Sequence, residues 1–300
     1  MTIHLIEFRA MGCGITVQLE AGKDGAAILS RIPEQVAELE RTLTRFNPTS
    51  ELMQLNARAG QWVTVSDVLL ENIRTAKQAA FLTDGLYNPL VLPALIANGY
   101  DRSFEQLDRT EITPSAPLPD WRGIEIHQDA VRIPSGSALD LGGIAKGWTA
   151  AHLADELSQH GACLVNIGGD MAIRGAPDGL LGWGIDIEDP ASGEVFLSLW
   201  LSNISIATSG IDFRHWQDVT GQVRHHIIDP QTGFPAQTDV LAVSVVHPHA
   251  PTAEAYAKAV MVRGAEDGLN WLNQQWQAVA LVFKQDGTVL STFPINERTM

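Results

Sequence analysis

The segment DLGGIAKGW, residues 140–148, places two glycines and a lysine at the start of a helical pattern. We expect a helix from Gly142 to about Gln159, followed by a strand over residues 163–167. A glycine pair that enters a helix exposes backbone N–H groups, and the helix dipole favours an anion at that end. Lys146 adds a positive charge of the kind that binds phosphate. The segment therefore predicts either a phosphate site or a tight turn with a surface lysine.

Outward from this segment, short strands come in runs and do not alternate regularly with helices. We expect strands at residues 3–8, 15–19, 183–187, 195–201, 204–207 and 240–246, hairpins at 124–133 and 278–293, and loops over 84–121. We expect a helix over residues 26–44, whose main part begins near Pro33. A second helix begins near Asp67, which can cap it, and a third spans residues 252–274. This order is typical of an α+β fold with mixed or antiparallel sheets and packed helices. The sequence has no internal repeat, low-complexity tract or clear linker, which predicts a single compact unit over residues 1–300.

Composition and charge exclude several classes of protein. The chain of 300 residues is 45 % hydrophobic and 18 % charged, which provides a substantial core and excludes general disorder. Its 20 Lys and Arg residues against 35 Asp and Glu residues give a net charge of -15, so we expect neither nucleic-acid binding nor attraction to an anionic membrane. No apolar stretch approaches the length of a membrane span. The N-terminus lacks a basic region and His4 and Glu7 break its apolar run, which argues against a signal peptide and predicts a cytoplasmic protein.

Three further glycine-containing segments carry candidate chemistry. NIGGD, residues 166–170, either ends a strand with residues that let a ligand approach the backbone, or is a bulge or hairpin turn. ATSG, residues 207–210, is a turn without the pattern that surrounds a nucleophilic hydrolase serine. HHIIDPQTGFP, residues 225–235, places two histidines before an expected strand, where adjacent side chains face opposite ways. Either one histidine faces a cleft and acts as a base near neutral pH, or one is exposed and the other is hydrogen-bonded.

The order of these segments along the chain is more specific than any one of them. MGC at residues 11–13, RFNPTSEL at 45–52, LN at 55–56 and GLYNPLV at 85–91 precede the four segments above. In this order the chain resembles the ApbE family, the FAD:protein FMN transferases, from about residue 8 to about residue 290. The resemblance implies an ApbE-type, T-fold-like architecture with FAD bound in a cleft. It also implies an enzyme that splits FAD at its pyrophosphate, attaches FMN to a Thr or Ser hydroxyl of an acceptor flavoprotein, and releases AMP.

The resemblance also assigns residues to that reaction. It implies that His226 takes the proton of the acceptor hydroxyl, and that Lys146 and the glycine-rich turns hold the diphosphate and offset the charge that develops on it. The FAD-binding residues that it implies are Met11, Leu86, Tyr87, Asn88, Lys146, Gly168, Gly169, Asp170, Ser209, Gly210, Ile227 and Asp229.

The magnesium site that the family implies is altered in this chain. The family motif Ala-Asp-x-x-x-Thr supplies two magnesium ligands from one helix face, and here the segment reads AEAYAK, residues 253–258. Glu254 keeps a carboxylate and stays a candidate ligand, but Lys258 has an ammonium that cannot bind a cation and would repel magnesium. Asn88 and Ala151 also stand where the family has Asp. Magnesium binding is therefore in question, and Lys258 can instead supply part of the charge of the metal.

Four functions are compatible with these residues. The first is an active FMN transferase with an altered metal site. The others are a protein that binds FAD without transfer, a hydrolase that converts FAD to FMN and AMP, and a structural protein without a ligand. We expect the transferase, and flavin retained on a denatured acceptor protein would separate it from the other three.

Overall fold

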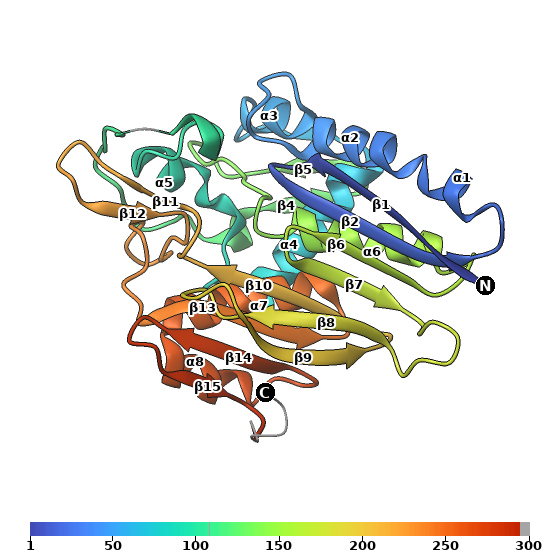
Figure 1. The fold of residues 1–300 in the computed structure, drawn as a ribbon. Helices are drawn as coiled ribbons and strands as arrows, with labels where there is room; N and C mark the ends of the chain where they lie inside the picture. The colour runs from blue at the N-terminus through green and yellow to red at the C-terminus, as the bar shows by residue number, and fades with distance from the viewer. Residues whose placement is uncertain (108, 295–300) are drawn as a thin grey trace.

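An eight-stranded sheet forms the centre of the structure, a computed structural model that describes residues 1–107 and 109–294 (Figure 1). Its strand order is β1-β2-β6-β7-β10-β13-β14-β15, and every neighbouring pair is antiparallel. The strands are β1 (Thr2–Ala10), β2 (Cys13–Ala21), β6 (Cys163–Ile167), β7 (Asp170–Arg174), β10 (Ser205–Gly210), β13 (Val240–His247), β14 (Val279–Lys284) and β15 (Val289–Ser291). Segments from both halves of the chain are thus joined in one sheet.

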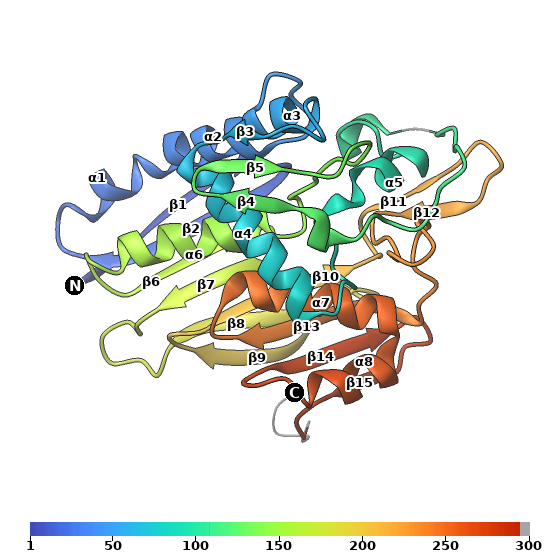
Figure 2. The same ribbon diagram turned by 180° about the vertical axis from the view of Figure 1, so that it is seen from behind.

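One face of this sheet is covered by helices, as the view from behind shows (Figure 2). Leu153 packs in one apolar cluster with Val17 and Val165 of the sheet, and Val260 packs in another with Val243. Burial of these side chains stabilises the fold, since removing apolar surface from water gains about 25 cal/mol per Å². The helices on this face are α1 (Gly25–Leu29), α2 (Ile32–Leu43), α6 (Ala145–Leu157), α7 (Ala250–Arg263) and α8 (Ala265–Leu272).

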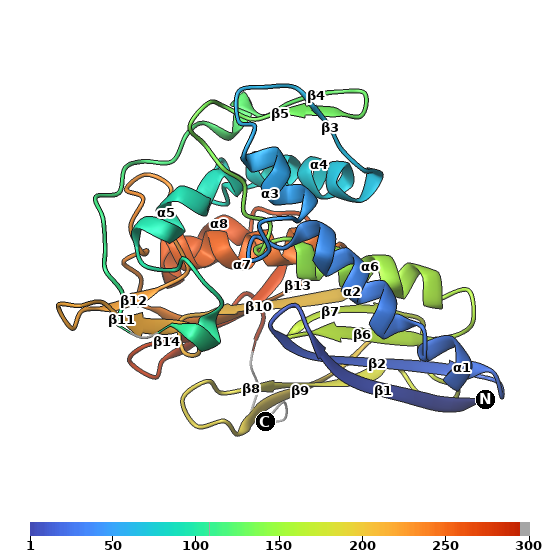
Figure 3. The same cartoon turned by 90° about the horizontal axis from the view of Figure 1, so that it is seen from above.

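The opposite face of the sheet packs against a two-stranded hairpin, β8 (Trp183–Glu188) and β9 (Val195–Leu201). Figure 3 shows this hairpin and the helices on opposite sides of the sheet. Buried and exposed residues alternate along β8, and Ile187 packs in one cluster with Leu281 and Phe283 of the sheet. The inner strands are therefore covered on both faces, which explains why they read as nearly continuous apolar runs.

A second apolar core lies around helix α4 (Asp67–Leu82). Leu69 and Ile73 of this helix are fully buried in one cluster with Leu139 and Ile144, which directly precede α6. This packing holds the start of α6 between the two cores. The elements of this part are α3 (Glu51–Asn56), β3 (Val63–Thr64), α4 (Asp67–Leu82), η1 (Pro89–Val91), α5 (Leu92–Ala97), η2 (Phe104–Gln106), η3 (Trp121–Gly123), β4 (Glu125–His127), β5 (Ala130–Arg132), β11 (His215–Gln217) and β12 (Val223–His225).

Apart from the strand expected after the histidine pair, the strands that the sequence predicts correspond to strands of the structure. The two predicted hairpins are β4–β5 and β14–β15, and residues 166–170 form a hairpin turn between β6 and β7. Strand β7 has no counterpart among the predicted strands, because Asp170 and Arg174 at its ends leave an apolar run of only three residues. The predicted α+β class is nevertheless confirmed, with antiparallel strands throughout the large sheet.

Two helices that the sequence predicts as continuous are each divided in two. The helix expected over residues 26–44 breaks at Ser30, and Pro33 lies in the first turn of its main part, α2, as expected. The helix expected over 252–274 breaks at Gly264, whose φ of 87° is left-handed. A glycine in this conformation ends a helix, so α7 and α8 are separate elements.

Several local predictions are wrong. Residues 207–210, which the sequence predicts as a turn, belong to strand β10. The cap of α4 is Ser66, whose hydroxyl accepts a backbone N–H of the first turn, and Asp67 is the first helical residue. Helix α5 lies within residues 84–121, where the sequence predicts loops, because a six-residue helix is too short to show a clear period. The histidine pair follows a strand and does not precede one: β12 ends at His225, and Ile228 forms only an isolated bridge.

Candidate active site

A cavity of about 1170 Å³ opens between the large sheet, the start of α6 and the segments around residues 86 and 213. Small-molecule sites span about 300–1,000 Å³, so this volume suits a ligand as large as a dinucleotide. Most residues that the sequence points to line the cavity, although they come from distant parts of the chain. They are Met11, Leu86, Tyr87, Asn88, Lys146, Gly168, Gly169, Ser209, Gly210, His226, Ile227, Glu254 and Lys258.

Two hairpin turns in contact with each other form one wall of the cavity. The β1–β2 turn holds Met11 and Gly12 at φ values of 53° and 68°, and the β6–β7 turn holds Gly168 and Gly169 at 59° and 94°. A Cβ atom on Gly168 would lie 2.8 Å from the Cβ of Cys13. Any other residue at position 168 would therefore push the two turns apart, which is the physical reason for a glycine there.

Four charged side chains meet at the start of α6. The Lys146 ammonium pairs with the Asp170 carboxylate and also lies 3.6 Å from Glu254 Oε1. The Lys258 ammonium lies 3.2 Å from the same Glu254 oxygen. The backbone N–H of Gly147 donates to Glu254 Oε2 at 3.1 Å. The cluster thus balances two ammoniums against two carboxylates, and both lysines line the cavity.

Burial and charge together set the ionisation of this cluster. The side chain of Glu254 is 1 % exposed, whereas those of Lys146 and Lys258 are 16 % and 18 % exposed. Burial by itself raises the pKa of Glu254, but the Lys258 and Lys146 ammoniums and the Gly147 N–H outweigh it and lower the pKa. Burial lowers the pKa of Lys146, opposed by Glu254 and reinforced by Lys258. Glu254 is therefore a carboxylate at neutral pH.

His226 lies on the cavity wall, directly after β12. Its Nδ1 lies 3.3 Å from the Arg214 carbonyl oxygen, which can only accept, so Nδ1 carries the proton and Nε2 keeps a lone pair. Burial, reinforced by the charges of Arg214 and Lys258, holds the pKa of His226 well below 6.5. The ring is neutral at neutral pH, as a general base must be. The neighbouring His225 has a different partner, with Nε2 3.1 Å from the Ala236 carbonyl oxygen.

Two residues that the resemblance assigns to FAD are absent from the cavity wall. Asp170 is fully buried behind Lys146 and holds its ammonium, while the second carboxylate oxygen, Oδ1, has no partner among the described residues. The Asp229 carboxylate accepts from the Gln231 N–H at 2.9 Å and from the Thr232 hydroxyl at 3.2 Å. Asp170 therefore positions a lysine, and Asp229 closes the turn that follows the histidine pair.

Tyr87 and Asn88 line the cavity in different states of hydrogen bonding. The Asn88 Nδ2 donates to the Pro119 carbonyl at 3.0 Å, and its Oδ1 accepts from the Leu90 N–H at 3.0 Å. The Tyr87 hydroxyl has no partner among the described residues. Burial, reinforced by Glu254, raises the pKa of Tyr87 well above 10.0, so the hydroxyl keeps its proton. Asn88 thus shapes the loop, whereas the buried Tyr87 hydroxyl keeps an unused donor.

Arg45 also lines the cavity, and no role for it follows from the sequence, although it begins the RFNPTSEL segment. Its Nε lies 2.8 Å from Asp140 Oδ2, and its Nη1 donates to the Tyr100 carbonyl at 2.9 Å. The guanidinium carbon lies 4.2 Å from the centre of the Phe46 ring and 4.4 Å from that of Tyr100. No local sequence pattern connects Arg45 with Tyr100 and Asp140, which lie far from it in the sequence. Arg214 also lines the cavity, as do Arg9 and the two lysines, and a lone arginine in a loop carries no sequence signal.

The groups around the Glu254 carboxylate do not form a site that suits magnesium. Magnesium needs a compact shell of oxygen ligands, whereas two ammoniums lie within 3.6 Å of this carboxylate and an N–H occupies its other oxygen. Within residues 1–107 and 109–294, no cluster of three or more His, Cys, Asp or Glu side chains could hold a metal ion. The Glu254 carboxylate therefore lacks the free oxygens and the oxygen neighbours that magnesium requires.

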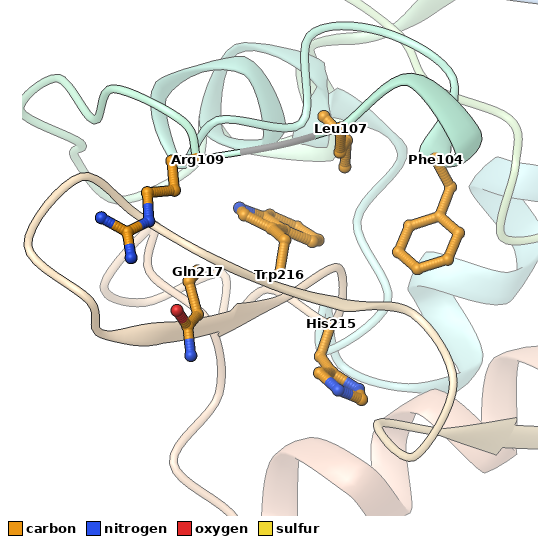
Figure 4. A pocket seen from close by; sticks show the side chains of 6 residues that line it. All are labelled: Phe104, Leu107, Arg109, His215, Trp216 and Gln217. Atoms are coloured by element: carbon orange, nitrogen blue, oxygen red, sulfur yellow. The ribbon is translucent and has the colours of Figure 1, made fainter.

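A smaller pocket of about 380 Å³ adjoins the cavity (Figure 4). Phe104 lines both hollows. The residues that the sequence points to line the larger one, which is therefore the candidate site. The smaller pocket is lined by Phe104, Leu107, Arg109, His215, Trp216 and Gln217.

The fold and the cavity together define a class of protein. An antiparallel α+β fold whose cavity combines glycine turns, two ammoniums and a neutral histidine suits the transfer of a phosphate-linked group. The chain belongs to the ApbE family, whose model matches residues 11–283. A protein named "FAD:protein FMN transferase" from Treponema pallidum (strain Nichols) is 30 % identical, covering 91 % of this chain and 81 % of its own length. One of the same name from Klebsiella pneumoniae (strain 342) is 26 % identical, covering 97 % of this chain and 93 % of its own length.

Solved structures share the fold over nearly their whole length. The ApbE protein from Thermotoga maritima matches with a TM-score of 0.86 and 25 % identity, covering 96 % of each chain. The apo form of the flavinyl transferase ApbE from Pseudomonas stutzeri matches with a TM-score of 0.83 and 25 % identity, covering 97 % of this chain and 94 % of that one. These comparisons confirm the resemblance and the ApbE-type fold that it implies.

Proposed function

We propose that this chain is an FAD:protein FMN transferase, which cleaves FAD and attaches FMN to a Thr or Ser of an acceptor flavoprotein. The proposal rests on one observation: a neutral histidine, His226, lines the same cavity as the ammoniums of Lys146 and Lys258. Transfer of a phosphate-linked group needs a base for the nucleophile and positive charge near the leaving group. The relatives that carry this activity in their names match 91 % and 97 % of this chain, which supports the same reaction here.

The lining of the cavity offers different surfaces to the parts of FAD. Met11, Leu86 and Ile227 offer apolar contact, which suits the flavin ring. The glycine turn at residues 168–169 and the end of β10, with Ser209 and Gly210, allow close approach of the backbone to a diphosphate. Together with the lysines, these groups bind and orient the ligand.

In the proposed reaction, the acceptor hydroxyl oxygen bonds to the phosphorus on the FMN side of the diphosphate. The hydroxyl proton passes to Nε2 of His226, and the P–O bond to the AMP side breaks with its electron pair, which leaves with AMP. The Lys146 and Lys258 ammoniums offset the negative charge that grows on the leaving phosphate. Each ammonium has three donors, so it can keep its carboxylate partner and still donate to the ligand during this step.

The test is incubation of the protein with FAD and an acceptor flavoprotein that has one modifiable threonine. We expect flavin fluorescence on the denatured acceptor and one AMP released for each flavin attached. His226→Asn should lower the transfer rate by about 10²- to 10⁴-fold, because a general base is lost, with little change in FAD affinity. His160→Asn, which changes an exposed histidine outside the cavity lining, is the matched control.

Two outcomes would contradict the proposal in different ways. Release of AMP and free FMN without labelling of the acceptor would identify an FAD hydrolase. Tight FAD binding without any AMP release would identify a binding protein. Only labelling of the acceptor that depends on His226 supports a transferase.

The acceptor, the compartment and the domain boundary stay predictions. We propose an acceptor flavoprotein with a Thr or Ser at its flavin attachment site, in the cytoplasm, and one domain over residues 1–300. In the described part of the chain, no helix combines the length and apolar character that a membrane crossing requires. Mass spectrometry of flavin-labelled proteins in fractionated cells would identify the acceptor and its compartment.

A further inference from the structure

Lys258 reaches the cavity from α7 across the start of α6. It lies one helical turn after Glu254, so both side chains project from the same face of the helix. A Cβ atom on Gly143 would lie 2.9 Å from Lys258 Cε and 3.0 Å from the Tyr87 ring. A glycine at position 143 therefore leaves the space that the lysine stem occupies. The side chain of Lys258 is 18 % exposed and lines the cavity, so its ammonium is accessible to a ligand.

Both oxygens of the Glu254 carboxylate are already engaged. Oε1 lies 3.2 Å from the Lys258 ammonium and 3.6 Å from that of Lys146, and Oε2 accepts from the Gly147 N–H at 3.1 Å. The Lys258 ammonium also lies 3.5 Å from the backbone carbonyl oxygen of Glu254. A divalent cation at this carboxylate would have to displace an ammonium, and both ammoniums would repel it.

The Lys258 charge also sets the net charge of the cluster at the start of α6. With Lys258, two ammoniums balance the carboxylates of Asp170 and Glu254. Without it, Lys146 alone would oppose two buried carboxylates, and the cluster beside the diphosphate would be negative. An ammonium has three donors, so Lys258 can keep its bond to Glu254 and still donate to a phosphate oxygen.

We propose that the Lys258 ammonium takes the place of a divalent cation in this chain. It neutralises Glu254 and donates to the FAD diphosphate, so that FAD binds without a metal. The proposal rests on the proposed function because FAD is the ligand. It goes further in two respects: Lys258 is an FAD-binding residue, and FAD binding is independent of magnesium.

The first test measures FAD affinity of the purified protein from flavin fluorescence, in EDTA and in excess MgCl₂. We expect the same affinity in both. Lys258→Met keeps a chain of similar length without the charge, and should weaken FAD binding by about tenfold to a hundredfold in both, the effect of one charge-assisted hydrogen bond. Lys23→Met removes the same charge from an exposed turn outside the cavity lining and should leave the affinity unchanged.

Two results would overturn the proposal while leaving the proposed function intact. One is FAD binding that strengthens by about tenfold or more when magnesium is added, as metal coordination would cause. The other is an unchanged FAD affinity in Lys258→Met. Absence of FAD binding in every condition would instead contradict the proposed function.

A second test needs no FAD. Mn²⁺ is titrated into the ligand-free protein and followed by electron paramagnetic resonance. We expect no Glu254-dependent Mn²⁺ site in the wild type, and a new site in the double variant Glu254→Asp/Lys258→Thr, which supplies two oxygen ligands and removes the ammonium. Mn²⁺ bound by the wild type and lost in Glu254→Gln would overturn the proposal. No gain of Mn²⁺ by the double variant would also overturn it, since Lys258 would then not be what excludes the metal.

Discussion

Two groups of charged residues border the same cavity and differ in how firmly each cation is held. They are the structural pair, Arg45 and Asp140, and the binding cluster, Lys146, Lys258 and Glu254. Arg45 is clamped between the Asp140 carboxylate at 2.8 Å, a backbone carbonyl and two aromatic rings. Its side chain is 6 % exposed, against 16 % for Lys146 and 18 % for Lys258. The Arg45 guanidinium is held at Nε and Nη1 and lies against two rings, although its Nη2 has no hydrogen-bond partner among the described residues. A guanidinium held in this way is a structural cation, whereas a lysine ammonium on a flexible stem can reach a ligand. Packing around the cation, and not its charge, therefore separates the structural pair from the binding cluster.

The largest effect is expected from breaking the structural pair. Arg45→Met leaves the Asp140 carboxylate buried without a cation, which should lower the free energy of unfolding by about 3–5 kcal/mol. Urea denaturation followed by tryptophan fluorescence measures this change. Arg45→Lys is the control, because it keeps the charge but loses the fork, and should lose less. A loss below about 1 kcal/mol in Arg45→Met, typical of an exposed pair, would show that the pair is not structural.

A smaller effect is expected at the binding cluster. Glu254→Gln removes the charge that faces both lysines, which should lower the free energy of unfolding by about 1–3 kcal/mol at neutral pH. The loss is smaller than for Arg45→Met because the lysines are more exposed and Lys146 keeps Asp170. The same urea denaturation measures it. A loss that equals or exceeds that of Arg45→Met would remove the distinction between the two groups.

The pH dependence of stability gives a sharper test of the same carboxylate. The pKa of Glu254 is lower in the folded protein than its ordinary value of 4.5. The ionised group therefore contributes stability that is present above about pH 4.5 and is lost as the pH falls through the folded pKa. The difference in unfolding free energy between the wild type and Glu254→Gln should shrink as the pH is lowered from about 7 to about 3. A difference that stays constant over this range would contradict the lowered pKa.

The smallest effect is expected at an exposed ion pair, which serves as the baseline. Arg41 Nη2 lies 3.2 Å from Glu34 Oε1, but the two side chains are 61 % and 79 % exposed. Arg41→Ala should change the free energy of unfolding by less than about 1 kcal/mol, because water screens such pairs. Salt should weaken even this small contribution. A loss as large as that of Arg45→Met would mean that burial is not what distinguishes the pairs.

The fold class and most strands could be predicted because their signals lie within a few residues. The apolar run at residues 163–167 and the glycines that follow it predict a strand and a turn without reference to the rest of the chain. Helix ends were harder to predict. The break at Ser30 has no glycine or proline at that position, and Gly264 can either interrupt a helix or be tolerated within it.

The residues of the candidate site could be predicted more fully than their contacts. The glycine turns, Lys146 and His226 lie on one cavity, where the resemblance implies that they act together. The sequence could not show that Asp170 lies behind a lysine or that Asp229 closes its own turn. These carboxylates carry the same chemistry in sequence, and only their neighbours in space distinguish their roles.

By itself, the sequence determined the family and placed a glycine pair at residues 168–169 and an ammonium at position 258. Only the tertiary structure decided which charges meet, because Lys146 comes from α6, Asp170 from β7 and Glu254 from α7. The physical reason is the range of the forces involved. Backbone conformation responds to neighbours a few residues away, whereas ion pairing and burial depend on how distant elements pack.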